Sequence, residues 1–314
     1  ATLSHRQPDR TPYQVEFTEK ILPKMEAFYG GTQFLQELNN DMDVFGCEPD
    51  GSWQEVRPDI WRDQFGVEWD RTMDKDIGVV CNRLVTKENL ESFVFPDVNE
   101  PSRYDRVAKA LAAPDRPQKF IVVNHGFSLF ERAWTLTGEE DLLAAMLLDK
   151  SYVHRLLDRI LEFNLSLIEK VCAYDIDAMM FGDDWGFQRG VVMGVKLWRE
   201  FIKPCVSQMY GLVKSAGKRV FIHSCGKVDA LFPDLIDIGL DAFNPFQPEV
   251  IDVYAAKTEF GNQLSFFGGV STQRLLPYGA VQEVRDEVTR ILDVVGKDGG
   301  YIAAPAHSIP GHAQ

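Results

Sequence analysis

A histidine and a cysteine two residues apart are the part of this sequence best suited to chemistry. His223 and Cys225 follow the apolar residues 220–222, and His307 follows a second apolar stretch at 301–304. Side chains two positions apart at a strand end point the same way, so one imidazole and one thiolate can bind the same ion. With His307 as a third ligand, a Zn²⁺ ion keeps an open coordination position, as catalytic zinc sites do. The alternative is a buried histidine beside an inert cysteine.

Two adjacent carboxylates form a second candidate. Asp183 and Asp184 follow the apolar residues 178–181 and precede Trp185. A carboxylate in a cavity can orient a metal ligand, bind a cationic group or act as a general base, whereas paired acids in a loop commonly cap a helix or remain solvated. Because this pair follows a wholly apolar segment, we expect at least one of the two to face a cavity. We assign catalytic roles to Asp183, Asp184 and His223.

These residues follow apolar segments that alternate with helical ones. A candidate first strand lies at 12–17, and the longest helical pattern covers 152–173. This order predicts a parallel sheet, and since no G-x-G-x-x-G motif follows a strand, we favour a (β/α)8 TIM-type barrel over an open doubly wound sheet. Beyond residue 118 the predicted strands are 120–124, 178–181, 219–223, 241–244, 264–267 and 301–304.

The stretch from about 18 to 118 has a different pattern and is expected to decorate the barrel. Residues 18–40 look helical, and residues 53–70 are typical of a short hairpin rich in aromatic and β-branched side chains. Residues 96–116 are rich in Pro, Asp and Arg around one short helix. We therefore expect an N-terminal helical and hairpin extension beside the barrel.

Polar and aromatic residues at the strand ends predict the substrate site, because the working residues of such barrels project from the carboxyl ends of the strands. For His125 a packing role is an equal alternative, for Glu131 an ion pair with Arg132, and for Gln188 hydrogen bonding within its own loop. The predicted substrate contacts are His125, Phe127, Glu131, Trp185, Gln188, Asn244 and Gln247.

Composition argues against several classes of partner. Lys plus Arg number 33 and Asp plus Glu 47, which gives a net charge of −14. Such a surface repels phosphate backbones and anionic lipids, so we expect neither nucleic-acid nor membrane partners. The five cysteines are scattered and do not form a disulfide framework, and no apolar run approaches the ~20 residues that span a bilayer. We expect a cytoplasmic protein.

In this order, the strand ends resemble those of the uroporphyrinogen decarboxylase superfamily. The resemblance extends over almost the whole chain and implies one barrel domain spanning residues 1–314, with its decoration at about 18–118. The matching stretches are residues 7–12, 126–134, 182–186, 198–204, 223–228, 244–247 and 304–310.

Within that superfamily, the chain looks closer to the zinc-dependent methyltransferase branch. The decarboxylases hold a porphyrinogen with an arginine-rich N-terminal segment, whereas residues 13–20 contain no arginine. His223 and Cys225 match the His-x-Cys motif of methylcobalamin:coenzyme M methyltransferases, in which a later cysteine stands where this chain has His307. The resemblance implies methyl transfer between a corrinoid (cobalamin) carried by a partner protein and a thiol, or a methoxy or methylamine compound.

Two other functions stay open at this point. The first is a metal-free decarboxylase of a smaller carboxylated molecule, in which Asp183 or Asp184 holds the protonated intermediate and His223 donates a proton. The second is a catalytically inactive binding barrel, which the many ionisable residues at the strand ends disfavour. The direction of methyl transfer is undecided, and a homodimer is an open alternative to a monomer.

Overall fold

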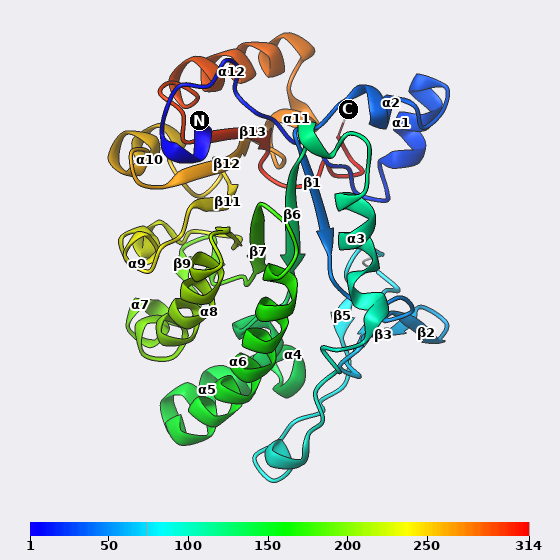
Figure 1. Ribbon diagram of the computed structural model, residues 1–314, viewed down its shortest axis with the longest axis vertical. Coiled ribbons are helices and arrows are strands. Elements are labelled where there is room, and N and C mark those ends of the chain that lie inside the picture. Colours follow the sequence, from blue (N-terminus) through cyan, green and yellow to red (C-terminus); the bar gives the residue numbers. More distant parts are fainter. Residues whose placement is uncertain (74, 314) are drawn as a thin grey trace.

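The computed structural model describes residues 1–73 and 75–313, and its centre is a curled, seven-stranded parallel sheet (Figure 1). The strand order is β1-β6-β7-β10-β11-β12-β13. Neighbouring strands of this sheet therefore follow one another in chain order, as the alternating pattern of strands and helices predicts. The strands are β1 (Met42–Gly46), β6 (Phe120–His125), β7 (Ala178–Gly182), β10 (Arg219–His223), β11 (Ala242–Phe246), β12 (Ser265–Val270) and β13 (Tyr301–Pro305).

The segment at 12–17 lies between the two edges of this sheet. Tyr13 pairs in parallel with Ala303 of β13, and Phe17 forms a second parallel bridge farther along. On the other side, the Tyr13 carbonyl oxygen accepts a hydrogen bond from the N–H of Asp41, one residue before β1. The predicted first strand therefore completes the barrel, although it forms isolated bridges and not a continuous ladder.

Helices surround the barrel (Figure 1). The longest, α6, begins after Asp149, whose side chain accepts a hydrogen bond from the N–H of Tyr152, and its apolar face is fully buried. A π-helical turn at Trp198–Ile202 joins α7 to α8, and 3₁₀ turns lie at Thr2–Ser4, Leu90–Ser92, Pro101–Tyr104, Arg116–Gln118 and Asp229–Leu231. The α-helices are α1 (Leu22–Tyr29), α2 (Phe34–Glu37), α3 (Asp105–Leu111), α4 (Phe130–Thr137), α5 (Glu139–Leu148), α6 (Lys150–Cys172), α7 (Gly194–Leu197), α8 (Lys203–Ser215), α9 (Phe232–Asp237), α10 (Val253–Phe260), α11 (Leu275–Tyr278) and α12 (Val281–Val294).

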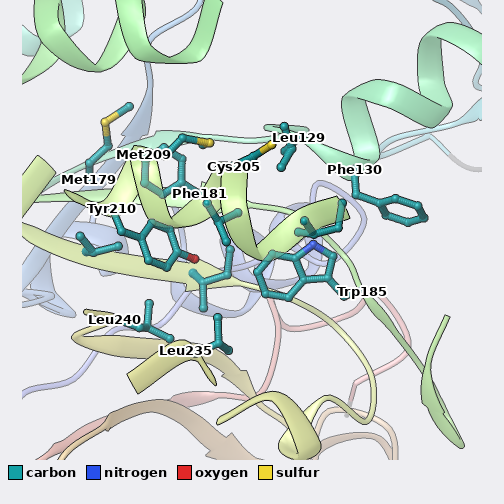
Figure 2. Close-up of a cluster of buried hydrophobic side chains, with 14 of the residues drawn as sticks. Leu129, Phe130, Met179, Phe181, Trp185, Cys205, Met209, Tyr210, Leu235 and Leu240 are labelled. Atoms are coloured by element: carbon teal, nitrogen blue, oxygen red, sulfur yellow. The ribbon is translucent and has the colours of Figure 1, made fainter. Parts of the chain in front are cut away.

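Alternation along the strands produces two apolar layers. Met179 and Phe181 of β7 point outward and pack with Met209 and Tyr210 of α8 in the layer between sheet and helices (Figure 2). Their neighbours on the same strands point into the barrel, because successive strand residues face opposite sides. The inner layer consists of Met42, Val122, Ala178, Met180, Phe221, Ala242, Phe267, Ile302 and Ala304.

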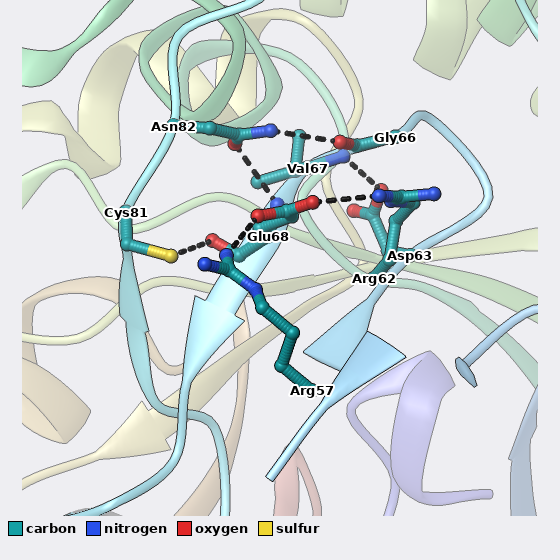
Figure 3. Close-up of polar contacts among 8 residues, drawn as sticks. All are labelled: Arg57, Arg62, Asp63, Gly66, Val67, Glu68, Cys81 and Asn82. Carbon is teal, nitrogen blue, oxygen red and sulfur yellow. Dashed lines mark hydrogen bonds and ion pairs between the residues drawn. The ribbon is translucent and has the colours of Figure 1, made fainter. Parts of the chain in front are cut away.

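A four-stranded antiparallel sheet of order β2-β3-β4-β5 stands beside the barrel (Figure 1). Glu68 in this sheet accepts hydrogen bonds from Arg57 and Arg62 (Figure 3). The neighbouring Trp69 packs edge to face on Phe127 at a centroid distance of 5.0 Å, so this sheet supports the loop that follows β6. Its strands are β2 (Gln54–Arg57), β3 (Ile60–Arg62), β4 (Glu68–Asp70) and β5 (Val79–Val80), and a separate hairpin pairs β8 (Gly186–Phe187) with β9 (Gly190–Val191).

The TIM-type class and the strands predicted beyond residue 118 are confirmed to within a few residues. The sequence pattern does not predict β1, because Asp43 interrupts its short apolar run; this strand lies within the stretch assigned to the decoration. Residues 18–40 form only the short helices α1 and α2, and the hairpin expected at 53–70 is part of the four-stranded sheet. Within the described residues, no helix combines the length and the apolar character that a bilayer-spanning segment needs.

Candidate active site

The residues predicted to bind zinc lie together at the carboxyl end of the barrel. His223 ends β10, Cys225 follows it by two residues, and His307 follows the end of β13. One ligand atom from each lies within 4.8 Å of the others, and His223 Nε2 is 3.5 Å from Cys225 Sγ. Two imidazole nitrogens and one thiolate sulfur form a donor set that suits Zn²⁺.

Hydrogen bonds hold the His223 ring in one orientation. Its Nδ1 lies 2.6 Å from Asn244 Oδ1, and Asn244 Nδ2 donates to the carbonyl oxygen of Phe267 at 3.1 Å. Because the amide nitrogen of Asn244 is engaged by that carbonyl, its oxygen faces the ring, and we assign the imidazole hydrogen to Nδ1. The lone pair on Nε2 then faces Cys225, which is the tautomer that metal ligation requires.

Close backbone packing shapes the turn that carries Cys225. Gly226 has φ +88°, and a Cβ at this position would lie 2.4 Å from the carbonyl carbon of Gly186, so only glycine fits. Asp184 Oδ1 accepts a hydrogen bond from the Cys225 N–H at 2.8 Å, and Gln247 Oε1 accepts one from the Gly226 N–H at 2.8 Å. Asp184 and Gln247 therefore help to position the thiol.

A cavity of about 320 Å³ opens beside the predicted zinc ligands. This volume is suitable for a small organic molecule. Of the predicted site residues, the structure brings Phe127, Glu131, Asp184, His223, Asn244 and His307 to its wall. The other residues lining the cavity are Gln14, Glu16, Val44, Ile77, Asn124, Gly126, Met180, Gly182, Phe267, Ala304, Pro305 and Ser308.

Burial and neighbouring charges shift the pKa values of Glu131, Cys225 and His307 around this cavity. Burial raises the pKa of Glu131, and the negative charges of Asp184 and Asp183 raise it further. Burial also raises the pKa of the Cys225 thiol, with Asp184 as the next cause, so a bound ion has to displace its proton. The pKa of His307 is lowered by desolvation and then by the nearby His223, which favours the neutral imidazole.

The two adjacent aspartates face opposite sides of the sheet. Gly182 lines the cavity, and Asp184 has the same parity along the chain, whereas Asp183 points towards the helices and is fully buried. Asp183 accepts hydrogen bonds from the backbone N–H groups of residues 129–131 at the start of α4, and from Trp185 Nε1 at 2.7 Å. Desolvation nevertheless raises its pKa to about 6. The structure thus places Asp183 as an N-terminal partner of a helix, away from the predicted catalytic position.

Several predicted substrate contacts also lie away from the cavity wall. His125 is buried on the helix side, where its Nε2 is 2.9 Å from Asn164 Oδ1 and burial lowers its pKa to about 4. Trp185 lies fully buried among apolar side chains (Figure 2). It packs on Trp198 at a centroid distance of 5.3 Å. Gln188 is exposed between β8 and β9. Strand parity turns His125 outward, since Asn124, one residue earlier, faces the cavity.

Sequence reasoning does not single out Gln14, Glu16 and Asn124, although all line the cavity. The signal for Asn124 is its two-residue spacing from the inward-facing Val122. Gln14 and Glu16 are likewise two residues apart on the candidate strand at 12–17, which places them on one face. Their role as wall residues depends on that segment completing the barrel.

The fold and the site define a TIM-type barrel with a mixed His/Cys centre at its carboxyl end. A family model described as uroporphyrinogen decarboxylase (URO-D) matches residues 62–314. The chain therefore belongs to the uroporphyrinogen decarboxylase family, as the resemblance of the strand ends predicts.

Solved structures support the fold. A methyltransferase from Methanosarcina mazei shares 15% sequence identity with this chain at a TM-score of 0.72, and the alignment covers 100% of this chain and 93% of that one. An archaeal fructose-1,6-bisphosphate aldolase shares 13% identity over 63% of this chain and 90% of its own, but its TM-score of 0.28 is too low to bear on the fold. A search of curated proteins finds no significant match.

Proposed function

We propose that the protein is a zinc-dependent methyltransferase that moves a methyl group between the corrinoid of a partner protein and a small thiol, or a methoxy or methylamine compound. The convergence of His223, Cys225 and His307 beside a cavity carries this proposal. The fold shared with a methyltransferase from Methanosarcina mazei supports it. We place the reaction in the cytoplasm, where free thiols stay reduced.

The donor set fits zinc in charge as well as in type. One thiolate and two neutral imidazoles leave a site of charge +1 around Zn²⁺, more positive than a site with two thiolates. When bound, the ion would supply a Lewis acid that lowers the pKa of a thiol or polarises an oxygen. The hydrogen bond from His223 Nδ1 to Asn244 and the bond from the Cys225 N–H to Asp184 hold both ligand side chains ready.

The protein residues have separate tasks in this reaction. Phe127 and Phe267 provide apolar wall and reduce the access of water to the cavity. Glu131, whose pKa is raised by burial, is a suitable acceptor for the proton that a thiol substrate loses. Asp184 holds the turn at Cys225 through its bond to the Cys225 N–H.

The decarboxylase alternative requires a carboxylate that is free to hold a protonated intermediate. Both oxygens of Asp183 are already engaged by the start of α4 and by Trp185. Of the two aspartates considered for this task, that leaves Asp184, which is itself bonded to the Cys225 N–H. This geometry favours methyl transfer over decarboxylation.

Absorption spectroscopy of cobalamin tests the proposal. Purified zinc-loaded protein is mixed with methylcobalamin and thiols, or with cob(I)alamin and methoxy or methylamine compounds. We expect loss or gain of the methyl group on cobalt with wild type and with the surface control Glu140→Gln, and none with Cys225→Ala. No change at cobalt with any donor or thiol would overturn the proposal, and CO₂ release by metal-stripped protein would favour the decarboxylase.

A further inference from the structure

Carboxylates dominate the charge of the cavity wall. Glu16, Glu131 and Asp184 all line it, and none of the described lining residues is a lysine or an arginine. Across residues 1–73 and 75–313, none of these carboxylates forms an ion pair. An anionic group entering the cavity would therefore meet negative charge without a counter-ion.

Unpaired acceptors on the same wall give an independent indication. Gln14 is 6% exposed, and its Oε1 has no hydrogen-bond partner among the described residues. Its Nε2 donates to Glu16 Oε1 at 3.2 Å, which fixes the amide with the unpaired oxygen on the other side. Asn124 Oδ1 is also buried and unpaired within the described part of the chain. A buried acceptor without a donor is costly, so both oxygens favour a ligand that brings N–H groups.

We infer that this wall, which we call the acceptor wall (Gln14, Glu16, Asn124, Glu131 and Asp184), recognises an organic ammonium group and rejects anionic substrates. The inference rests on the proposed function, which supplies the other end of the substrate: a thiol directed at the proposed zinc ligands. His223 and His307 line the same cavity as the acceptor wall, so one small molecule can reach both. The substrate class is then a small aminothiol.

Thiols that differ only in the charge of their second group test this inference. The probes are 2-aminoethanethiol, 2-mercaptoethanol and 2-mercaptoethanesulfonate, together with their three-carbon homologues. Titration calorimetry on the zinc-loaded protein measures binding, and absorption of the Co²⁺-substituted protein reports whether the sulfur reaches the metal. We expect the ammonium thiol to bind about 100-fold more tightly than the sulfonate, with the neutral thiol between them, because like charges brought together oppose binding.

Replacing a carboxylate by an amide of nearly the same size separates the contribution of the acceptor wall from the intrinsic acidity of each thiol. Glu131→Gln removes the acceptor for the proton of either thiol, so it should weaken both. It should weaken the ammonium thiol about 10-fold more than the neutral thiol, since only the first contains a charge. Glu16→Gln, at an exposed position where folding is not at risk, should give the same pattern at about 3-fold because solvent screens it. Glu140→Gln makes the same change of net charge on the exposed surface and should change neither affinity.

The two measurements distinguish failure of this inference from failure of the proposed function. If thiols produce no thiolate-to-Co²⁺ absorption, the thiol form of the proposed function is overturned, while calorimetry still decides the charge preference. If the absorption appears but the sulfonate binds as tightly as the ammonium thiol, the acceptor-wall inference is overturned and the proposed function stands. Equal effects of Glu131→Gln on the ammonium and neutral thiols would also overturn the inference.

Discussion

Asp183 and Asp184 are neighbours in the chain, yet one faces the helix layer and the other the cavity. Asp183 accepts hydrogen bonds from the start of α4 and from Trp185, and its carboxylate is buried. Asp184 makes one bond to the Cys225 backbone and lines the cavity beside Glu131. The same contrast separates His125, bonded to Asn164, from Asn124, whose Oδ1 is unpaired among the described residues.

Asp183 and His125 on the helix side thus have their partners within the protein, whereas Gln14 Oε1 and Asn124 Oδ1 on the cavity side have none among the described residues. Buried groups that are fully hydrogen-bonded stabilise a fold, but they have no capacity left for a ligand. Unpaired acceptors, and carboxylates without a counter-ion, reduce stability and are tolerated where a ligand completes them. Substitutions on the helix side should therefore affect stability, and those on the cavity side should affect binding.

The largest effect is expected at the proposed zinc ligands. Cys225→Ala removes the thiolate and should lower zinc affinity by more than about 1,000-fold, because two imidazoles alone make an incomplete site. Elemental analysis after dialysis against a weak chelator measures the retained zinc. Cys172→Ala, a cysteine distant from the site in sequence and without a ligand role, should keep the metal. Undiminished zinc in Cys225→Ala, or near-zero zinc in wild type, would contradict the assignment.

Asp183→Ala should be the most destabilising change on the helix side. It leaves the first N–H groups of α4 and the Trp185 indole without their buried acceptor, and we expect the free energy of unfolding to fall by about 3 kcal/mol. Denaturant unfolding followed by circular dichroism measures this. A loss below about 0.5 kcal/mol would show that the helix start is satisfied in another way.

His125 should make stability depend on pH. Its pKa is lowered to about 4 in the folded state, whereas an unfolded histidine titrates near 6.5. Between these values the unfolded chain binds a proton that the folded protein does not, so this contribution to stability is lost as pH falls from about 6.5 to 4.

The variant His125→Gln keeps a donor to Asn164 and removes this titration. Relative to the variant, wild type should lose roughly 2–3 kcal/mol of unfolding free energy as pH falls from 6.5 to 4. Unfolding curves of both proteins across this range provide the comparison. A constant difference between them would show that His125 titrates normally.

Of the four predicted substitutions, Asp184→Asn should have the smallest effect. Unlike Asp183→Ala, it should affect zinc binding or turnover and not stability. Weakening the hydrogen bond to the Cys225 N–H should reduce zinc affinity or turnover by about 10–100-fold, with little loss of fold stability. Competition with a chelator measures the affinity, and denaturant unfolding of the metal-free protein measures the stability. Wild-type zinc affinity and wild-type activity in this variant would show that substitutions on the cavity side do not act through metal binding.

Local patterns explain which parts of the fold and site could be predicted. The segments 178–181 and 219–223 have the length and the apolar centre of buried strands, and His223 and Cys225 are two residues apart on one chain segment. The strand β1 could not be predicted because Asp43 interrupts its apolar run. Its pairing with β6 stabilises it as a strand, which its own composition does not. For His125 and Trp185, residue type alone does not say which side of the strand end they occupy.

The sequence by itself determined the order of strands and helices, the polar strand ends and the pair His223 and Cys225, because periodicity and spacing are properties of one segment. Only the tertiary structure decided that His307 joins that pair, and that Asp184 rather than Asp183 faces the cavity. It also placed Gln14 opposite residues far along the chain. These outcomes depend on the register between distant strands and on closure of the barrel, since a shift of one residue exchanges the two faces of a strand.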